Sequence, residues 1–307
     1  MTEASELPKR PVHELAEGPE CDAANRLLKR VAGLPLRAIE HSIKLARGRF
    51  LGERFLIGID PKLWDRLGLQ TLPEDLGMPR EMWEQFRAAL PSANFLGLAF
   101  EQETDGCLYK AYVEFPVLIE RHCYRPGLAS RPAMIYIGFK WDPASVARQA
   151  ITYYHWEPRL PAALIASRMA RHISAIGHAP VRLLVESLFE LAKGRIGGEA
   201  MIYLEAEEEK SRRRSFALSF YKAGINLGDI RAELLGVAEV LAFPRAPLEA
   251  RLERDAAQDE TQIERLDDID HIRRHMRLVT AQRAEALRMR IFLERARTRL
   301  PRPLIQL

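Results

Sequence analysis

The chain has 307 residues, of which 47% are hydrophobic and 29% are charged, a composition typical of globular proteins with a sizeable core. No apolar run approaches the roughly 18–20 residues of a membrane helix, and the N-terminus has no basic region followed by an apolar core, so we expect a cytoplasmic protein. The formal net charge is +4, but ten arginines and only two glutamates lie in residues 271–302. The rest of the chain is mildly acidic, which argues against nucleic-acid binding by the body and leaves the arginines of the tail as a weaker candidate for it.

The first ninety residues are predicted to be mainly helical. Residues 1–19 are polar, contain three prolines and are expected to form a flexible leader. Leu36, Ile39 and Ile43 recur at spacings of three and four, which indicates one apolar stripe of a helix. A proline at 61 ends a short apolar run. The predicted elements are helices over 21–31, 36–46 and 80–90 and a strand over 54–60.

The central part of the chain is predicted to form antiparallel strands. Tyr109, Ala111 and Val113 alternate with polar residues, a period of two that places one set on each face of a sheet. Thr104-Asp105-Gly106 supplies the residues of a tight turn, because glycine accepts a positive φ without steric cost. The predicted strands cover residues 94–101, 107–115, 133–141 and 151–156.

The second half of the body repeats this order of elements. Helices are predicted over 161–173, 181–193 and 227–241, and strands over 200–206 and 214–221. A helix followed by two hairpin strands therefore occurs near 80–115 and again near 181–221. The sequence predicts an α+β body over 20–248, in which helices cover one face of an antiparallel sheet of about seven strands.

This repeated helix-strand-strand unit resembles that of the aromatic prenyltransferases. The resemblance implies an active site enclosed by the strands, which in that family close into a barrel. About seven strands are fewer than such a closed barrel usually has, and the resemblance concerns topology alone.

The C-terminal segment differs from the body in being basic and continuously helical in pattern. Residues 259–299 contain neither glycine nor proline and keep an apolar stripe, which predicts a long basic helix over 255–300. His271 and His275 could share one face of this helix, but they lack the further carboxylate of a metal site and are read as surface residues. No metal site is predicted, and no motif identifies a cofactor.

One face of the predicted sheet carries the candidate functional residues. Lys110, Tyr112 and Glu114 share a face of their strand, with Glu114 as the candidate base. Such a face could bind an anionic ligand that has an apolar or aromatic part, because lysines offset negative charge and rings pack on the apolar portion. The alternative is a solvent-exposed face with ordinary cross-strand pairs. Neighbouring strands would add Tyr136, Lys140, Tyr154 and Trp156.

Arg214 is the last candidate ligand-binding residue. It ends the run Arg212-Arg213-Arg214, which could clamp a phosphate or a carboxylate. The alternative interpretation is a solvated turn whose arginines balance the negative charge of Glu207-Glu208-Glu209.

Two functions from different classes follow. The first is a small-molecule-binding protein or enzyme, possibly a transferase, whose anionic ligand lies on the sheet face. The second is a non-catalytic assembly protein in which residues 259–299 pair with a second copy or with an acidic partner.

Overall fold

The computed structural model describes residues 19–46, 48–52, 54–103, 106–115, 132–157, 160–173, 179–196, 201–210, 214–219, 223, 225, 228–253 and 305–306. The predicted leader, apart from Pro19, and the predicted helix over 255–300 lie outside these residues. The assembly hypothesis that depends on residues 259–299 therefore stays a prediction.

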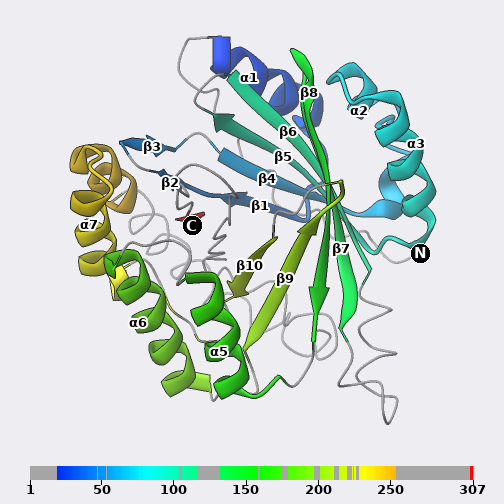
Figure 1. The fold of residues 1–307 in the computed structure, drawn as a ribbon. Helices are drawn as coiled ribbons and strands as arrows, with labels where there is room; N and C mark the ends of the chain where they lie inside the picture. The colour runs from blue at the N-terminus through cyan, green and yellow to red at the C-terminus, as the bar shows by residue number, and fades with distance from the viewer. Residues whose placement is uncertain are drawn as a thin grey trace, which may run out of the picture. The chain divides into compact units, whose positions relative to one another are not determined.

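The described elements mix helices and strands, as the sequence predicts (Figure 1). The α-helices are α1 (Pro19–Val31), α2 (Leu72–Asp75), α3 (Arg80–Ala89), α5 (Ala162–Ile173), α6 (Ala179–Ile196) and α7 (Arg231–Val240). The 3₁₀ helices are η1 (Pro61–Leu63), η2 (Leu90–Ser92) and η5 (Gly228–Ile230). The strands are β1 (Ala38–His41), β2 (Lys44–Ala46), β3 (Arg49–Leu51), β4 (Arg54–Ile59), β5 (Phe95–Glu103), β6 (Gly106–Glu114), β7 (Ala133–Asp142), β8 (Ser145–Trp156), β9 (Ile202–Glu208), β10 (Arg214–Ser219) and β11 (Ile305–Gln306).

The chain forms two compact units. The first draws its described residues from Met1–Ser42, Glu53–Pro158 and Glu205–Arg214. The second draws them from Ile43–Gly52, Arg159–Leu204 and Ser215–Leu307.

The main sheet has eight strands in the order β1-β4-β5-β6-β7-β8-β9-β10, and the pairs from β1 to β8 are antiparallel. The predicted hairpin over residues 94–115 is confirmed, with Phe95 opposite Glu114 and Glu103 opposite Gly106. Gly106 has a φ of +111°, a conformation that glycine adopts without strain. The α+β class and the antiparallel sheet are confirmed. The element orders α3-β5-β6 and α6-β9-β10 agree with the predicted repeat. A repeat in the structure of these two segments stays a prediction.

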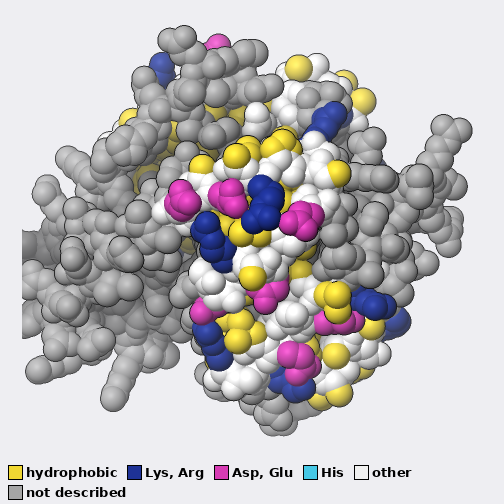
Figure 2. All heavy atoms as spheres, turned by 90° about the vertical axis from the view of Figure 1, so that its left-hand side faces the viewer, with side chains coloured by type: hydrophobic (Ala, Val, Ile, Leu, Met, Phe, Trp, Pro, Cys, Tyr) yellow, Lys and Arg dark blue, Asp and Glu magenta, His cyan; other side chains and the backbone are white. Residues whose placement is uncertain are grey.

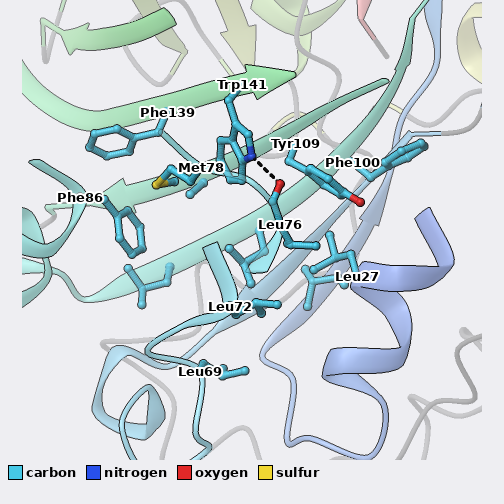
Figure 3. Packing of buried hydrophobic residues seen from close by; sticks show 14 of the residues in the cluster. Leu27, Leu69, Leu72, Leu76, Met78, Phe86, Phe100, Tyr109, Phe139 and Trp141 are labelled. Atoms are coloured by element: carbon cyan, nitrogen blue, oxygen red, sulfur yellow. Dashed lines mark hydrogen bonds between the residues drawn. The ribbon is translucent and has the colours of Figure 1, made fainter. Parts of the chain in front are cut away.

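The core of the first unit lies between one face of the sheet and helices α1, α2 and α3 (Figure 3). Leu27 of α1 and Phe86 of α3 are buried in it, and the ring of Phe86 meets Phe139 of β7 edge-on at 5.6 Å. Tyr109 and Trp141 lie on the same face of β6 and β7, directly opposite one another. The predicted apolar face of β6 is therefore the core face.

Two polar groups within this core are satisfied by backbone carbonyls. The Tyr109 hydroxyl donates to the carbonyl oxygen of Ala23 at 2.8 Å, and the Trp141 Nε1–H donates to that of Leu76 at 2.9 Å. Burial raises the pKa of Tyr109 to about 12, so the phenol keeps its proton and remains a donor at neutral pH. These two bonds connect the sheet to α1 and to the segment after α2.

The prediction of a helix over 36–46 is wrong. Ala38–His41 forms β1, which pairs with β4, and Lys44–Ala46 forms β2, which pairs with β3. The apolar spacing suits a helix, but strand pairing between residues distant in sequence decides the structure. This error accounts for the eighth strand of the main sheet, because β1 is the one strand of that sheet that the sequence prediction lacks. The separate three-stranded sheet in the order β11-β2-β3 was not predicted either.

Strand β8 begins six residues earlier than the predicted start at Ile151. Asp142 and Pro143 lie at a tight turn that joins β7 directly to β8, since Asp142 lies opposite Ser145. The Asp142 carboxylate accepts from the backbone N–H of Ala144 at 2.8 Å and from Arg148 at 2.9 Å. An aspartate that bonds the backbone two residues on is a usual turn device.

The second unit has a separate apolar core. Helices α5, α6 and α7 supply Ile165, Leu188 and Leu234 to it, and Phe216 of β10 stacks on Tyr203 of β9 at 5.7 Å. On the side that carries α6 and α7, the described surface mixes acidic and basic side chains (Figure 2). No helix in the described part of the chain has the length and apolar character that a membrane span requires.

Candidate functional site

The face of the main sheet opposite the core of the first unit carries the candidate residues. Lys110 lies directly opposite Lys140, and Glu114 lies directly opposite Tyr136, which in turn lies opposite Tyr154. Side chains of directly paired residues project to the same side of a sheet. We call the following set the polar face: Arg54, Glu101, Lys110, Tyr112, Glu114, Tyr136, Lys140 and Tyr154.

Most of this face is withdrawn from solvent. Glu114 and Tyr154 are each 7% exposed, and the Lys110 side chain is 13% exposed. Tyr112, Tyr136 and Lys140 are half-buried. The alternative of a solvent-exposed face does not describe Glu114, Tyr154 and Lys110, and their burial favours charges that are balanced within the protein or by a ligand. A ligand on this face stays a prediction.

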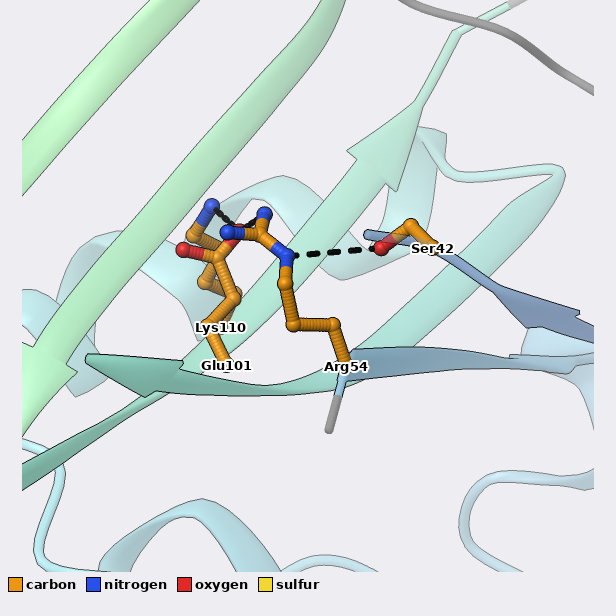
Figure 4. A network of polar contacts seen from close by, with 4 residues as sticks. All are labelled: Ser42, Arg54, Glu101 and Lys110. Atoms are coloured by element: carbon orange, nitrogen blue, oxygen red, sulfur yellow. Dashed lines mark hydrogen bonds and ion pairs between the residues drawn. The ribbon is translucent and has the colours of Figure 1, made fainter. Parts of the chain in front are cut away.

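A charge network occupies one end of the polar face (Figure 4). The Glu101 carboxylate accepts from Arg54 Nη2 and from Lys110 Nζ. Arg54 lies directly opposite Glu101 on the neighbouring strand, and its Nε donates to the Ser42 hydroxyl at 3.4 Å. The network thus joins the segment after β1 to β4, β5 and β6.

Arg54 and Glu101 are more deeply buried than any of the sequence candidates, at 2% and 5% exposure. Arg54 Nη1 is also buried and has no hydrogen-bond partner among the described residues. A buried guanidinium nitrogen without a partner carries a desolvation cost, which an acceptor from a ligand or a water would relieve. This end of the face therefore has an unused donor.

The lysines strengthen the cationic character of this end. Burial lowers the pKa of Lys110, and the Glu101 carboxylate beside it opposes that shift. Lys140 lies directly across from Lys110, and like charges in that position destabilise a sheet unless an anion balances them. An acceptor from an additional anion would satisfy Arg54 Nη1, the buried donor of this end.

Three tyrosines form the other end of the polar face. The rings of Tyr112 and Tyr154 are 6.3 Å apart, and those of Tyr136 and Tyr154 meet edge-on at 6.2 Å. The Tyr136 hydroxyl donates to Glu114 Oε1 at 3.4 Å. Tyrosine rings present a negative π face, which attracts cations and packs on unsaturated groups.

A glycine makes room for these rings. A Cβ atom on Gly138 would lie 3.0 Å from a ring carbon of Tyr112 and 3.2 Å from one of Tyr154. Any side chain at this position would force one of the two rings to move. Gly138 therefore allows the tyrosines to lie close over the middle of β7.

Two sequence candidates are less closely tied to the site. Trp156 ends β8 opposite Ala133, beyond the register shift between Met134 and Tyr136, and is half-buried. Arg214 is the first residue of β10, and its side chain lies outside the described part of the structure. The roles of both residues as ligand contacts stay predictions.

Sequence reasoning missed Arg54 and Glu101. Arg54 opens a strand that was predicted correctly, and Glu101 belongs to the predicted strand over 94–101. Their pairing across 47 positions is what brings the charges together. The available signal was the period of two, because Glu101 lies on the same face of its strand as Gly97 and Ala99, which lie opposite Tyr112 and Lys110.

No group of three or more histidine, cysteine, aspartate or glutamate side chains suited to a metal occurs among the residues that the structure describes. Cys107 of β6 is buried in the core of the first unit. The chemistry available on the polar face is that of cations, tyrosine rings and a carboxylate.

The fold of the chain is similar to that of known prenyltransferases. 5-dimethylallyltryptophan synthase from Streptomyces coelicolor superposes with a TM-score of 0.56 at 15% identity, covering 94% of this chain and 91% of that chain. PriB in complex with product diphosphate gives 0.54 at 15% identity, covering 94% and 89%. Prenyltransferase PriB with L-tryptophan and dimethylallyl thiolodiphosphate gives 0.53 at 13% identity, covering 94% and 89%.

No protein-family model and no curated protein matches the sequence. At these identities the structural likeness concerns the fold alone.

Proposed function

We propose that the chain is a prenyltransferase that moves an allylic prenyl group from its diphosphate to an aromatic acceptor. The observation that carries the proposal is the polar face itself, a buried surface with cations at one end, tyrosines at the other and a carboxylate between tyrosines. The fold supports it, because structures of similar fold have been solved with diphosphate, dimethylallyl thiolodiphosphate and tryptophan.

The cationic end suits the leaving group. When the carbon–oxygen bond to the diphosphate breaks, the electron pair leaves with the diphosphate, whose negative charge grows. Lys110, Lys140 and Arg54 Nη1 would donate hydrogen bonds to its oxygens. Preorganised donors aimed at developing negative charge lower the barrier without reorganising during the reaction.

The tyrosine end suits the other product of that cleavage, an allylic carbocation. The rings of Tyr112, Tyr136 and Tyr154 would stabilise it through their π faces and exclude water that would otherwise capture it. A carbon of the aromatic acceptor then attacks the cation and forms the new carbon–carbon bond.

Glu114 is the candidate base for the last step. After attack, the acceptor ring must lose one proton to regain aromaticity, and a carboxylate on the same face could take it. The overall change is then prenyl diphosphate plus arene giving prenylated arene, diphosphate and one proton. The Tyr136 hydroxyl, which bonds Glu114, would hold the carboxylate in place.

The purified full-length chain is expected to form a prenylated product when incubated with dimethylallyl diphosphate and a panel of aromatic acceptors that includes tryptophan. Mass spectrometry would detect an acceptor that gains one prenyl group, and a coupled assay would detect equimolar diphosphate. Glu114→Gln should slow product formation about 10²- to 10⁴-fold, the usual contribution of a general base.

Tyr153→Phe provides the matched control, because Tyr153 is the neighbour of Tyr154 on the opposite face of β8. Its product formation should equal that of the wild type. Absence of product from every acceptor and from longer prenyl diphosphates, in a protein that is folded, would refute the proposed function.

A further inference from the structure

Glu101 occupies the position in which a bound anion would be expected. A single oxygen, Oε1, accepts from both Arg54 Nη2 and Lys110 Nζ. A diphosphate oxygen would make the same pair of contacts. The protein thus supplies its own carboxylate to the cations of the proposed diphosphate site.

The network has more donor capacity than Glu101 uses. Arg54 Nη1 is a buried donor with no partner among the described residues. A lysine ammonium also has three protons to donate, and a second lysine lies directly opposite Lys110. An anion with several oxygens could accept from Arg54 Nη1 as well as from Arg54 Nη2 and Lys110, whereas Glu101 Oε1 accepts only from the last two of these.

We infer that Glu101 is a built-in counter-ion that competes with the ligand for Arg54 and Lys110 and thereby lowers the affinity of the site for anions. In the absence of ligand it neutralises buried positive charge and keeps the cations in position. A bound diphosphate must displace it from Arg54 and Lys110. The inference rests on the proposed function, since it concerns how the same site binds its diphosphate substrate.

The charged groups around the network agree with this role. Arg54 and Lys110 bring two positive charges to the Glu101 carboxylate. Glu103, two residues further along β5, also attracts Lys110. Replacing Glu101 with the neutral glutamine keeps the shape and one acceptor oxygen but raises the local charge by one unit.

Calorimetry with inorganic diphosphate and inorganic phosphate on the full chain tests the inference. Glu101→Gln is expected to bind diphosphate at least about tenfold more tightly than the wild type, because a like charge no longer opposes the anion. It should gain less affinity for phosphate, because a like charge opposes the less charged phosphate less strongly. Glu101→Asp keeps the charge but shortens its reach to Lys110, so its diphosphate affinity should lie between the two.

Asp142→Asn is the matched control. It also neutralises a buried carboxylate that pairs with an arginine in the first unit, but at the turn between β7 and β8. It should leave both affinities unchanged. Should Glu101→Gln fail to fold, the Asp variant retains the test, because a merely positioning carboxylate predicts weaker rather than tighter binding.

The outcomes separate this inference from the proposed function. Equal or weaker diphosphate binding by both Glu101 variants, in a wild type that still transfers a prenyl group, would overturn the inference alone. Tighter binding by the variants in a protein that forms no prenylated product would support the counter-ion and reject the proposed function. Failure of the wild type and both variants to bind diphosphate would reject both.

Discussion

Replacing Arg54 with methionine is expected to lower the free energy of unfolding by about 3–5 kcal/mol, the usual cost of leaving a buried charge without its partner. Arg54 is 2% exposed and is one of two cations that the Glu101 carboxylate accepts from. The Glu101 carboxylate would then lose its buried guanidinium partner. Urea denaturation followed by tryptophan fluorescence would measure the loss.

The double variant Arg54→Met/Glu101→Met should recover part of this loss, because the buried carboxylate that lacks its arginine is removed as well. Recovery should be incomplete, because Lys110 then loses Glu101 as its partner. Arg80→Met is the control. Arg80 pairs with Glu84 on the surface of α3, with its side chain 89% exposed, and its loss should cost less than about 0.5 kcal/mol. An Arg54 variant as stable as the Arg80 variant would contradict the buried network.

The second large effect concerns the lysines. Lys110→Met and Lys140→Met should each lower the rate of prenyl transfer about 10²- to 10³-fold, the typical cost of removing one charged donor from a developing anion. Methionine keeps much of the apolar stem of lysine, so packing changes little. Rates of product formation at saturating dimethylallyl diphosphate would measure the effect.

Lys62→Met serves as the control for this pair. Lys62 is an exposed lysine of η1, outside the polar face, and its replacement should leave the rate unchanged. Wild-type rates in both Lys110 and Lys140 variants would remove these residues from the site. An equal loss in the Lys62 variant would show a general rather than a local effect of charge.

The parts of the site that follow a local pattern could be predicted from the sequence. Lys110, Tyr112 and Glu114 alternate with core residues over a few positions, and a period of two assigns their face directly. The strands β4 to β7 were predicted within a residue or two for the same reason. The α+β class follows from these strands and from the helical spacing in α3, α5 and α6.

The features that the sequence did not predict depend on contacts between residues that are distant along the chain. Arg54 and Glu101 meet only because β4 pairs with β5 in one register, and no local pattern fixes that register. Strand β1 was mistaken for a helix because a four-residue strand offers too few positions to establish a period. The burial of the polar face could not be predicted either, because alternation alone is equally compatible with a solvated face.

The most direct test of the account is a crystal structure of the wild-type chain with dimethylallyl thiolodiphosphate, an unreactive analogue of the proposed donor. The account predicts diphosphate oxygens within hydrogen-bond distance of Lys110 Nζ, Lys140 Nζ and Arg54 Nη1, with the prenyl tail against Tyr112 and Tyr154. A diphosphate bound away from the polar face, or a soaked crystal at saturating analogue with none bound, would contradict it.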